Sequence, residues 1–527
     1  MFRHTSSANR SAFSSLACAA LTSLGVQAGP LNQPHAGKLI DVLTYHYDDA
    51  RTGSNSRETQ LAVDSVSSSR FGLLATLKVQ GSVLAQPLVV SDFRMPDSSV
   101  HDVVVVATTT NDVYAIDTNS TETLWHVNLG TPQRGDDLKC ERKPGRTWGI
   151  SATPVISRAG PGRAALYVVA STEDTPGDFR LMLHALDMAD GSDLHRPARV
   201  FAKATQDDGK TLKLSSRHQY VRAGLAHRNG RLYVTLTSRC EAVVEDKITG
   251  WILLYDERLK QEGVFSTISS NPDGLKLGSV WAAGFAPAID SDGSVFAVTG
   301  NGNFSVAGKD WGESVLRLAP TLARVQDHFT PDNHEFLNAA DLDFGGGGVL
   351  LVPAKDVPNA PPLAVAMGKA HKLYLLARDN LGRMQDGDAG ALQAQQLGGE
   401  GVFGGPAYWL GPDGPLVYYQ QRGDVMRAYA LHTHAKPKLV EVAQGTETAG
   451  NSIPIVSSHG SRAGTGIVWT INQSSFRAYD AQTLQQPIFE TTIPPFSGGS
   501  AFVTPVVANG RVYVGTAGAV LVYGLSH

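Results

Sequence analysis

The sequence predicts an all-β protein, an eight-bladed β-propeller of four-stranded antiparallel blades. A short unit recurs eight times, with an opening strand ending in or near Pro-x-Val, a strand containing Tyr or Phe, and a strand reading Ala-x-Asp or a relative of it. The clearest copy is VVVVATTTNDVYAIDTNSTETLWHVNLG at 103–130. Alternating apolar positions rich in β-branched residues indicate strands throughout. A fixed-period array of short strands is typical of propellers and solenoids.

The eight copies follow one another along the chain. Their opening strands are expected at 85–90, 151–156, 222–227, 284–289, 347–353, 404–409, 452–457 and 503–508. Each is followed by a second strand, such as VVVVAT or LYVVAS, and by a third, such as VYAID or MRAYA. Several blades have long connections, and loops on a rigid scaffold are where such folds carry function.

The eighth copy stops after its third strand, at Leu525. A strand of the missing kind, FGLLATLKVQG at 71–81, lies just before the first copy. We expect it to complete the last blade and close the ring, because an open array leaves unpaired strand edges. A seven-bladed ring and an open array are the alternatives.

The N-terminal 28 residues have the pattern of a signal peptide. Arg3 and Arg10 form a basic start, residues 11–26 are small and apolar, and Val26-Gln27-Ala28 resembles a cleavage site. No later apolar run is long enough to span a bilayer. We therefore expect an exported protein, periplasmic or extracellular, with a disordered tail as the alternative reading.

The remaining chain divides into an N-terminal segment at 29–70, which is expected to wrap the ring, and a single propeller domain at 71–527. With 45 Lys and Arg against 49 Asp and Glu, the net charge is −4, which excludes a strongly basic nucleic-acid binder. Export leaves Cys140 and Cys240, which can pair as a disulfide in an oxidising compartment or remain free thiols.

The copy AIDTNSTETLW at 115–125 resembles the tryptophan-docking repeat of quinoprotein alcohol dehydrogenases, Ala-x-Asp-x-x-Thr-Gly-x-x-x-Trp. Ala115, Asp117 and Trp125 match it, whereas Ser120-Thr121 replaces Thr-Gly. The N-terminal YHYDDARTGSN also looks like the segment that precedes the first blade in that superfamily. The resemblance covers nearly the whole mature chain. It implies the propeller fold, with pyrroloquinoline quinone and Ca²⁺ in a funnel on one face.

Loops that follow strands two and four of a blade open on the same face, so residues far apart in sequence can converge there. In blade four, the resemblance implies that Trp281 is the flat floor for a quinone and that Asn301 is an oxygen ligand to calcium. Packing for Trp281 and turn formation for Asn301 are the alternatives. In blade two, Glu173 follows strand two, where the superfamily has a carboxylate ligand, although the match requires a three-residue insertion.

Blade five departs from the superfamily pattern His-x-Asp-Arg-Asn-Gly-x-x-Tyr. Aligning the tyrosine places Gly368 at the proposed base and Lys369 at the quinone-contacting arginine. Glycine cannot take a proton, whereas lysine can contact an anionic quinone as a point charge. Asp341, Asp343 and His371 are the candidates for a replacement base, which needs proton reach and a tuned pKa. Carboxylates that stabilise a Gly-rich turn are the alternative.

These patterns favour an exported propeller with a small-molecule or glycan pocket in its funnel. It is a divergent quinone-dependent oxidoreductase with a non-standard base if it is an enzyme. The residues equally allow a protein without a cofactor. A non-catalytic secreted scaffold that binds a protein or glycan is one alternative, and a polysaccharide lyase or hydrolase is another, although no carboxylate pair stands out for the latter.

Overall fold

A computed structural model describes residues 39–138, 146–239, 241, 248–270, 276–434, 436–448, 450, 452–472, 474–496 and 502–526. The expected signal peptide at 1–28 lies outside the described residues, and so do Cys140 and Cys240 with their expected pairing. Within the described chain, no helix is both long enough and apolar enough to cross a membrane.

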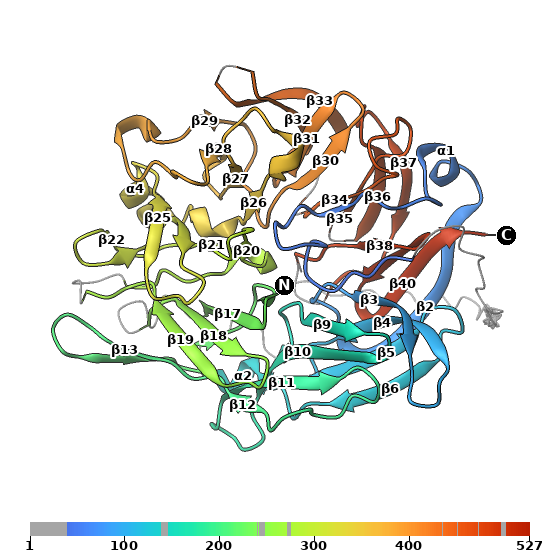
Figure 1. Ribbon diagram of the computed structural model, residues 1–527, viewed down its shortest axis with the longest axis horizontal. Helices are drawn as coiled ribbons and strands as arrows, with labels where there is room; N and C mark the ends of the chain where they lie inside the picture. The colour runs from blue at the N-terminus through green and yellow to red at the C-terminus, as the bar shows by residue number, and fades with distance from the viewer. Residues whose placement is uncertain are drawn as a thin grey trace, which may run out of the picture.

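Eight antiparallel sheets surround a central axis, and the chain visits them in sequence order, as the colour progression in Figure 1 shows. The first strand of each sheet lies toward the axis and the fourth lies at the rim. The eight-bladed propeller expected from the sequence is therefore confirmed.

The strands of blades one to four are β3 (Leu88–Arg94), β4 (Val100–Ala107), β5 (Asp112–Asp117) and β6 (Thr123–Asn128); β9 (Val155–Gly160), β10 (Arg163–Thr172), β11 (Arg180–Asp187) and β12 (Ala198–Arg199); β16 (Ala226–Arg228), β17 (Arg231–Ser238), β18 (Trp251–Asp256) and β19 (Gln261–Ser266); and β20 (Ala288–Ile289), β21 (Val295–Val298), β24 (Val315–Leu318) and β25 (Val325–Phe329).

The strands of blades five to eight are β26 (Val349–Leu351), β27 (Leu363–Met367), β28 (Lys372–Ala377) and β29 (Gln393–Gln396); β30 (Ala407–Gly411), β31 (Gly414–Gln420), β32 (Val425–His432) and β33 (Lys438–Thr448); β34 (Ile455–Ser457), β35 (Ile467–Asn472), β36 (Ser475–Asp480) and β37 (Pro487–Thr492); and β38 (Val506–Ala508), β39 (Arg511–Gly515), β40 (Ala517–Leu525) and β2 (Phe71–Ser82).

Short strands and helices lie in the loops between these strands. The additional strands are β1 (Ser54–Asn55), β7 (Gln133–Arg134), β8 (Thr147–Trp148), β13 (Lys203–Thr205), β14 (Thr211–Lys213), β15 (Gln219–Tyr220), β22 (Phe304–Ser305) and β23 (Asp310–Trp311). The helices are α1 (Val63–Val66), α2 (Gly135–Leu138) and α4 (His334–Ala340), with 3₁₀ turns η1 (Ala282–Gly284), η2 (Phe344–Gly346), η3 (Ala354–Asp356) and η4 (Asp386–Asp388).

The ring closes through its N-terminal strand. β2 pairs antiparallel with β40, from Phe71 opposite Leu525 to Ser82 opposite Ala517, and so supplies the fourth strand of blade eight. In Figure 1 this blue strand lies beside the red C-terminal strand. The seven-bladed ring and the open array are thereby excluded.

Trp125 on β6 joins blade one to blade two. Its indole Nε1 donates a hydrogen bond of 2.9 Å to the carbonyl oxygen of Met188, and its ring is buried among residues of both blades. A Cβ on Gly191 would lie only 2.7 Å from the indole carbon Cε3. The Trp and the Gly-containing turn of the next blade therefore fit together as one contact between blades.

The segment at 42–55 contacts all eight blades. It forms backbone hydrogen bonds with the first strands of most blades and a side-chain contact with the others. The partners are Val42 with Val89, Leu43 with Ile156, Asp49 with Arg228 and Ile289, Ala50 with Leu351, Thr52 with Tyr408, Gly53 with Val456, and Asn55 with Val507. This segment therefore links the blades to one another on the face opposite the loops that follow strands two and four.

His46, within this segment, is completely buried. Its ring stacks on Tyr45 with centroids 4.7 Å apart and meets Phe285 edge-on at the same distance. Burial lowers the pKa of His46 from 6.5 to about 3, so the folded protein holds the imidazole neutral.

This pKa difference predicts an acid-dependent loss of stability. Between pH 6.5 and pH 3 the unfolded chain binds a proton at His46 that the folded chain does not, so the free energy of unfolding falls as the pH falls, by up to about 1.4 kcal/mol per pH unit. We expect His46→Phe, which keeps a ring in the stack, to lose less stability than the wild type between pH 7 and pH 5. Urea unfolding of both proteins across this range measures the difference, and parallel curves would contradict the prediction.

Candidate functional site

A cavity of about 310 Å³ opens among the loops that follow strands two and four of blades three, four and five. Five residues expected from the sequence line it: Trp281, Asn301, Asp341, Asp343 and Lys369. They come from four separate loops, and the order of strands within each blade brings these loops to one face.

Lys369 is the cation between the two aspartates. Its Nζ contacts the Asp343 carboxylate directly and lies 3.2 Å from Oδ1 of Asp341. Lys369 and Asp343 are each 16% exposed, whereas Asp341 is 77% exposed. Burial alone lowers the pKa of Lys369, but the two carboxylates outweigh it and the pKa is raised, so the ammonium stays charged.

Asn301 is held by both aspartates. Its backbone N–H donates to Oδ1 of Asp343 at 3.3 Å, and its side-chain Nδ2 donates to Oδ1 of Asp341 at 3.0 Å. Its side-chain Oδ1 is buried and accepts no hydrogen bond from the described residues. An amide oxygen left without a donor has lone pairs available for a cation.

Helix α4 holds the Asn301 loop in place through hydrogen bonds. The Asn338 side chain accepts a hydrogen bond of 2.9 Å from the N–H of Gly302 and donates one of 3.0 Å to its carbonyl oxygen. Asp341 is the C-cap directly after this helix, in the left-handed conformation with φ 55°. The helix therefore couples the position of the amide to the position of the carboxylate.

Trp281 contributes an aromatic surface. Its ring meets Phe502 edge-on at 5.2 Å and Phe403 edge-on at 6.1 Å, and these two phenylalanines stack on each other at 5.4 Å. Phe403 also lines the cavity, and it follows the fourth strand of blade five. The indole is thereby held in a fixed orientation by two rings.

Arg239 and Glu241 also line the cavity, and they were not anticipated from the sequence. They follow β17, the second strand of blade three. The strand-position rule, that loops after strands two and four of a blade open on the same face, singled out Glu173 in blade two and could have found them. The Ser238 hydroxyl donates to the Glu241 carboxylate. Burial raises the pKa of Glu241, and the nearby Asp343 carboxylate raises it further.

Glu313 lies behind Asp343 and is completely buried. Its Oε2 accepts a hydrogen bond of 2.6 Å from the N–H of Phe344, and its Oε1 has no partner in the part of the chain that the structure describes. Burial and the Asp343 carboxylate raise its pKa well above the ordinary value, which favours the neutral acid. Nothing in the local sequence, Gly-Glu-Ser before β24, marked this residue.

No family model matches the sequence, and no curated protein matches it. Among solved structures, a quinohemoprotein alcohol dehydrogenase from Pseudomonas putida HK5 is similar, with 14% identity, a TM-score of 0.59, and coverage of 92% of this chain and 80% of its own. The quinohemoprotein alcohol dehydrogenase from Comamonas testosteroni is 16% identical, with a TM-score of 0.57 and the same coverage. A europium-containing methanol dehydrogenase is 13% identical, with a TM-score of 0.59, and the match covers 92% of this chain and 98% of the dehydrogenase.

The chain has the fold of the quinoprotein alcohol dehydrogenases. The similarity extends over most of both chains, so the resemblance read from the repeat is confirmed at the level of architecture. Identities of 13–16% carry no residue roles by themselves.

Gly368 cannot be replaced by a side chain in this structure. A Cβ at this position would lie 2.6 Å from Cα of Phe344 and 2.7 Å from its carbonyl oxygen. The N–H of Lys369 donates a 3.0 Å hydrogen bond to the carbonyl of Asp343 and keeps the two loops in this close contact. The carboxylate beside Lys369 therefore comes from Asp343 on the neighbouring loop.

Glu173 and His371 do not line the cavity. Glu173 is buried in blade two, where its Oε1 accepts a 2.7 Å hydrogen bond from the N–H of Gly177 and its Oε2 has no partner among the described residues. His371 is in the turn between β27 and β28, with φ 58° and a buried Nδ1 to which no described residue is bonded. Of the residues expected from the sequence, the structure thus leaves Glu173 of blade two and His371 of blade five outside the cavity.

Proposed function

We propose that this protein is a divergent quinone-dependent oxidoreductase that binds pyrroloquinoline quinone and Ca²⁺ in the 310 Å³ cavity and oxidises an alcohol. The observation that carries the proposal is the convergence of Trp281, Asn301, Asp343 and Lys369 on one cavity. The ring around it has the fold of quinoprotein alcohol dehydrogenases.

The residues present fit a hard cation. The unpartnered Asn301 Oδ1 and the Asp343 carboxylate are oxygen donors of the kind that Ca²⁺ prefers. Within the described part of the chain, no three His, Cys, Asp or Glu side chains form a metal-binding group. The quinone's own oxygens would therefore have to complete the coordination, which makes binding of the two groups interdependent.

The charges that line the cavity support the same interdependence. Three acidic residues, Glu241, Asp341 and Asp343, line the cavity together with two basic ones, Arg239 and Lys369. A quinone that carries several carboxylates is repelled by these acidic side chains unless a divalent cation accompanies it. We expect quinone binding to require Ca²⁺ and to be abolished by a chelator.

The protein side chains have distinct roles in this proposal. When bound, the quinone supplies the acceptor for two electrons. Asp343 accepts the proton of the alcohol hydroxyl, and Lys369 positions Asp343 and interacts with anionic oxygens. Trp281 provides the flat surface against which a planar ring stacks.

Titration of the purified mature protein with pyrroloquinoline quinone and Ca²⁺ tests the proposal. We expect quenching of tryptophan fluorescence and dye-linked oxidation of primary alcohols, with less quenching in Trp281→Ala. Quinone with chelator in place of Ca²⁺ is the control. If neither quenching nor activity appears, the oxidoreductase proposal is wrong and a non-catalytic scaffold becomes the leading function.

Export and the disulfide belong to the same proposal. Cleavage after Ala28 would leave a mature chain beginning at Gly29, which mass spectrometry of the secreted or periplasmic protein measures.

Thiol titration of that mature chain under denaturing conditions tests the pairing of Cys140 and Cys240, with zero free thiols expected.

A further inference from the structure

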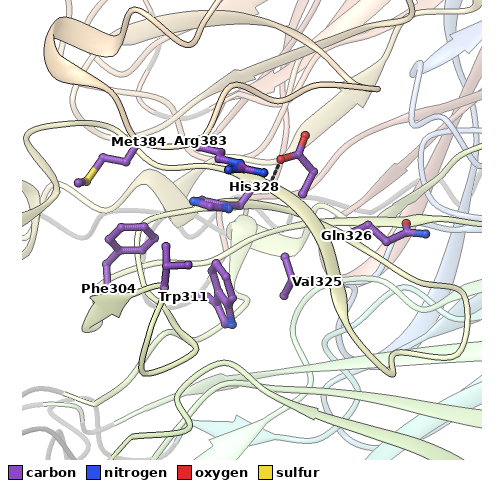
Figure 2. A pocket seen from close by; sticks show the side chains of 9 residues that line it. Phe304, Trp311, Val325, Gln326, His328, Arg383 and Met384 are labelled. Atoms are coloured by element: carbon purple, nitrogen blue, oxygen red, sulfur yellow. Dashed lines mark hydrogen bonds between the residues drawn. The ribbon is translucent and has the colours of Figure 1, made fainter.

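A second cavity, of about 400 Å³, lies at the rim of the ring. It lies between the β22–β23 hairpin, strand β25 and the turn at 383–384, and it shares no lining residue with the 310 Å³ cavity described above. In Figure 2, Arg383 and Met384 lie above, Phe304 and Trp311 lie below, and His328 lies between them.

The walls of this rim cavity are mainly apolar and aromatic. Phe304 and Trp311 have ring centroids 6.4 Å apart, and the His328 ring lies 5.1 Å from Trp311. Val306 and Met384 also line the cavity, yet they are 56% and 43% exposed. Large apolar side chains left in solvent around a concave aromatic surface are typical of a ligand site.

Arg383 brings a cationic side chain to this cavity. Its N–H donates a 2.9 Å hydrogen bond to the carbonyl of His328, which fixes its backbone at the cavity. Among the described residues, no carboxylate forms an ion pair with its guanidinium. The carboxylate that also lines the cavity, Asp327, instead accepts backbone N–H groups of His328 at 2.9 Å and Leu381 at 2.6 Å.

His328 adds no second charge. Burial lowers its pKa, and the neighbouring Arg383 lowers it further, although Asp327 opposes this, so the imidazole is neutral near pH 7. The cavity therefore combines an apolar, aromatic interior with the cation of Arg383, whose guanidinium can bind a carboxylate with two parallel hydrogen bonds.

We propose that the rim cavity is a binding site for a small planar aromatic carboxylate, whose ring lies among Phe304, Trp311 and Met384 and whose carboxylate pairs with Arg383. The ring gains burial and aromatic contact, and the carboxylate gains a charge-assisted hydrogen bond. This site is independent of the quinone proposal.

The test uses 2-naphthoate as the probe and the full-length mature protein labelled with ¹³C at the methionine methyl groups. We expect the Met384 methyl signal, assigned by its loss in Met384→Leu, to shift saturably because it lies beside the naphthalene ring. The neutral analogue 2-naphthamide should bind about tenfold more weakly.

Arg383→Gln should weaken naphthoate binding about tenfold and leave naphthamide binding unchanged, because the substitution removes the charge and keeps an amide donor. Arg258→Gln, at an exposed position in blade three, is the matched control and should bind as the wild type does. An unshifted Met384 signal overturns the site. Equal binding of the two probes, or unchanged naphthoate binding in Arg383→Gln, overturns the assignment of an anion.

Discussion

Asp343→Asn is expected to reduce the turnover of the quinone-loaded protein by about 10²- to 10⁴-fold. An amide has nearly the same shape as the carboxylate but cannot accept the proton of an alcohol, and general base catalysis contributes this range. Dye-linked oxidation at saturating alcohol measures the effect. Tryptophan quenching by quinone, measured in parallel at saturating Ca²⁺, separates lost chemistry from lost binding.

Asp341→Asn is the matched control, because Asp341 touches the same lysine and the same asparagine but is 77% exposed. We expect its activity to fall less than tenfold, since an exposed ion pair contributes little. If Asp341→Asn is the more damaging change, Asp341 and not Asp343 is the base. If neither change matters, the base lies outside this pair.

The sequence predicted the architecture because each copy of the repeat corresponds to one blade. Eight copies of one unit, and a spare strand at the N-terminus, leave few ways to build a ring without open edges, and the pairing of β2 with β40 follows that logic. Trp125 is likewise visible as a repeat position, and it meets Gly191 because neighbouring blades repeat the same geometry.

The inner strands are shorter than the sequence pattern indicated. The pattern extends over about six residues per copy, but β20 comprises two residues and β26, β34 and β38 comprise three each. Near the axis the preceding residues bond to a neighbouring blade instead: the N–H of Gly348 donates to the carbonyl of Gly404 in the following blade, and that of Leu225 donates to the carbonyl of Thr153 in the preceding one. Apolar alternation alone does not show whether a residue pairs with a strand of its own blade or with a neighbouring blade.

The site was predictable only in part, because a strand-position rule gives the face of a residue and not its direction. Trp281, Asn301 and Lys369 meet, whereas Glu173 obeys the same rule yet bonds within its own loop. Glu313 could not be predicted, because its raised pKa results from burial next to Asp343, which no local sequence pattern indicates. Arg239 and Glu241 required only that the rule be applied to blade three as well.

The segment at 42–55 leads to the largest expected effect on stability, at Arg51. This side chain is completely buried, and it donates hydrogen bonds of 2.9 Å to the carbonyls of Pro287, Tyr45 and Asp48 and to the Thr44 hydroxyl. One guanidinium thus joins the segment to blade four from a position where water cannot substitute for it. Its removal leaves several buried acceptors unpaired, and each costs roughly 1–3 kcal/mol before relaxation.

We therefore expect Arg51→Ala to lower the free energy of unfolding by about 3–5 kcal/mol, as urea denaturation followed by circular dichroism would measure. Arg51→Lys should recover only part of this loss, since an ammonium cannot reach carbonyls on both sides as a planar guanidinium does. Arg57→Ala, an exposed arginine in the same N-terminal region, should change stability by less than about 0.5 kcal/mol. Equal losses in Arg51→Ala and Arg57→Ala would show that the segment lies on the ring without stabilising it, whereas the predicted contrast would make it the element that holds the eight blades in one closed array.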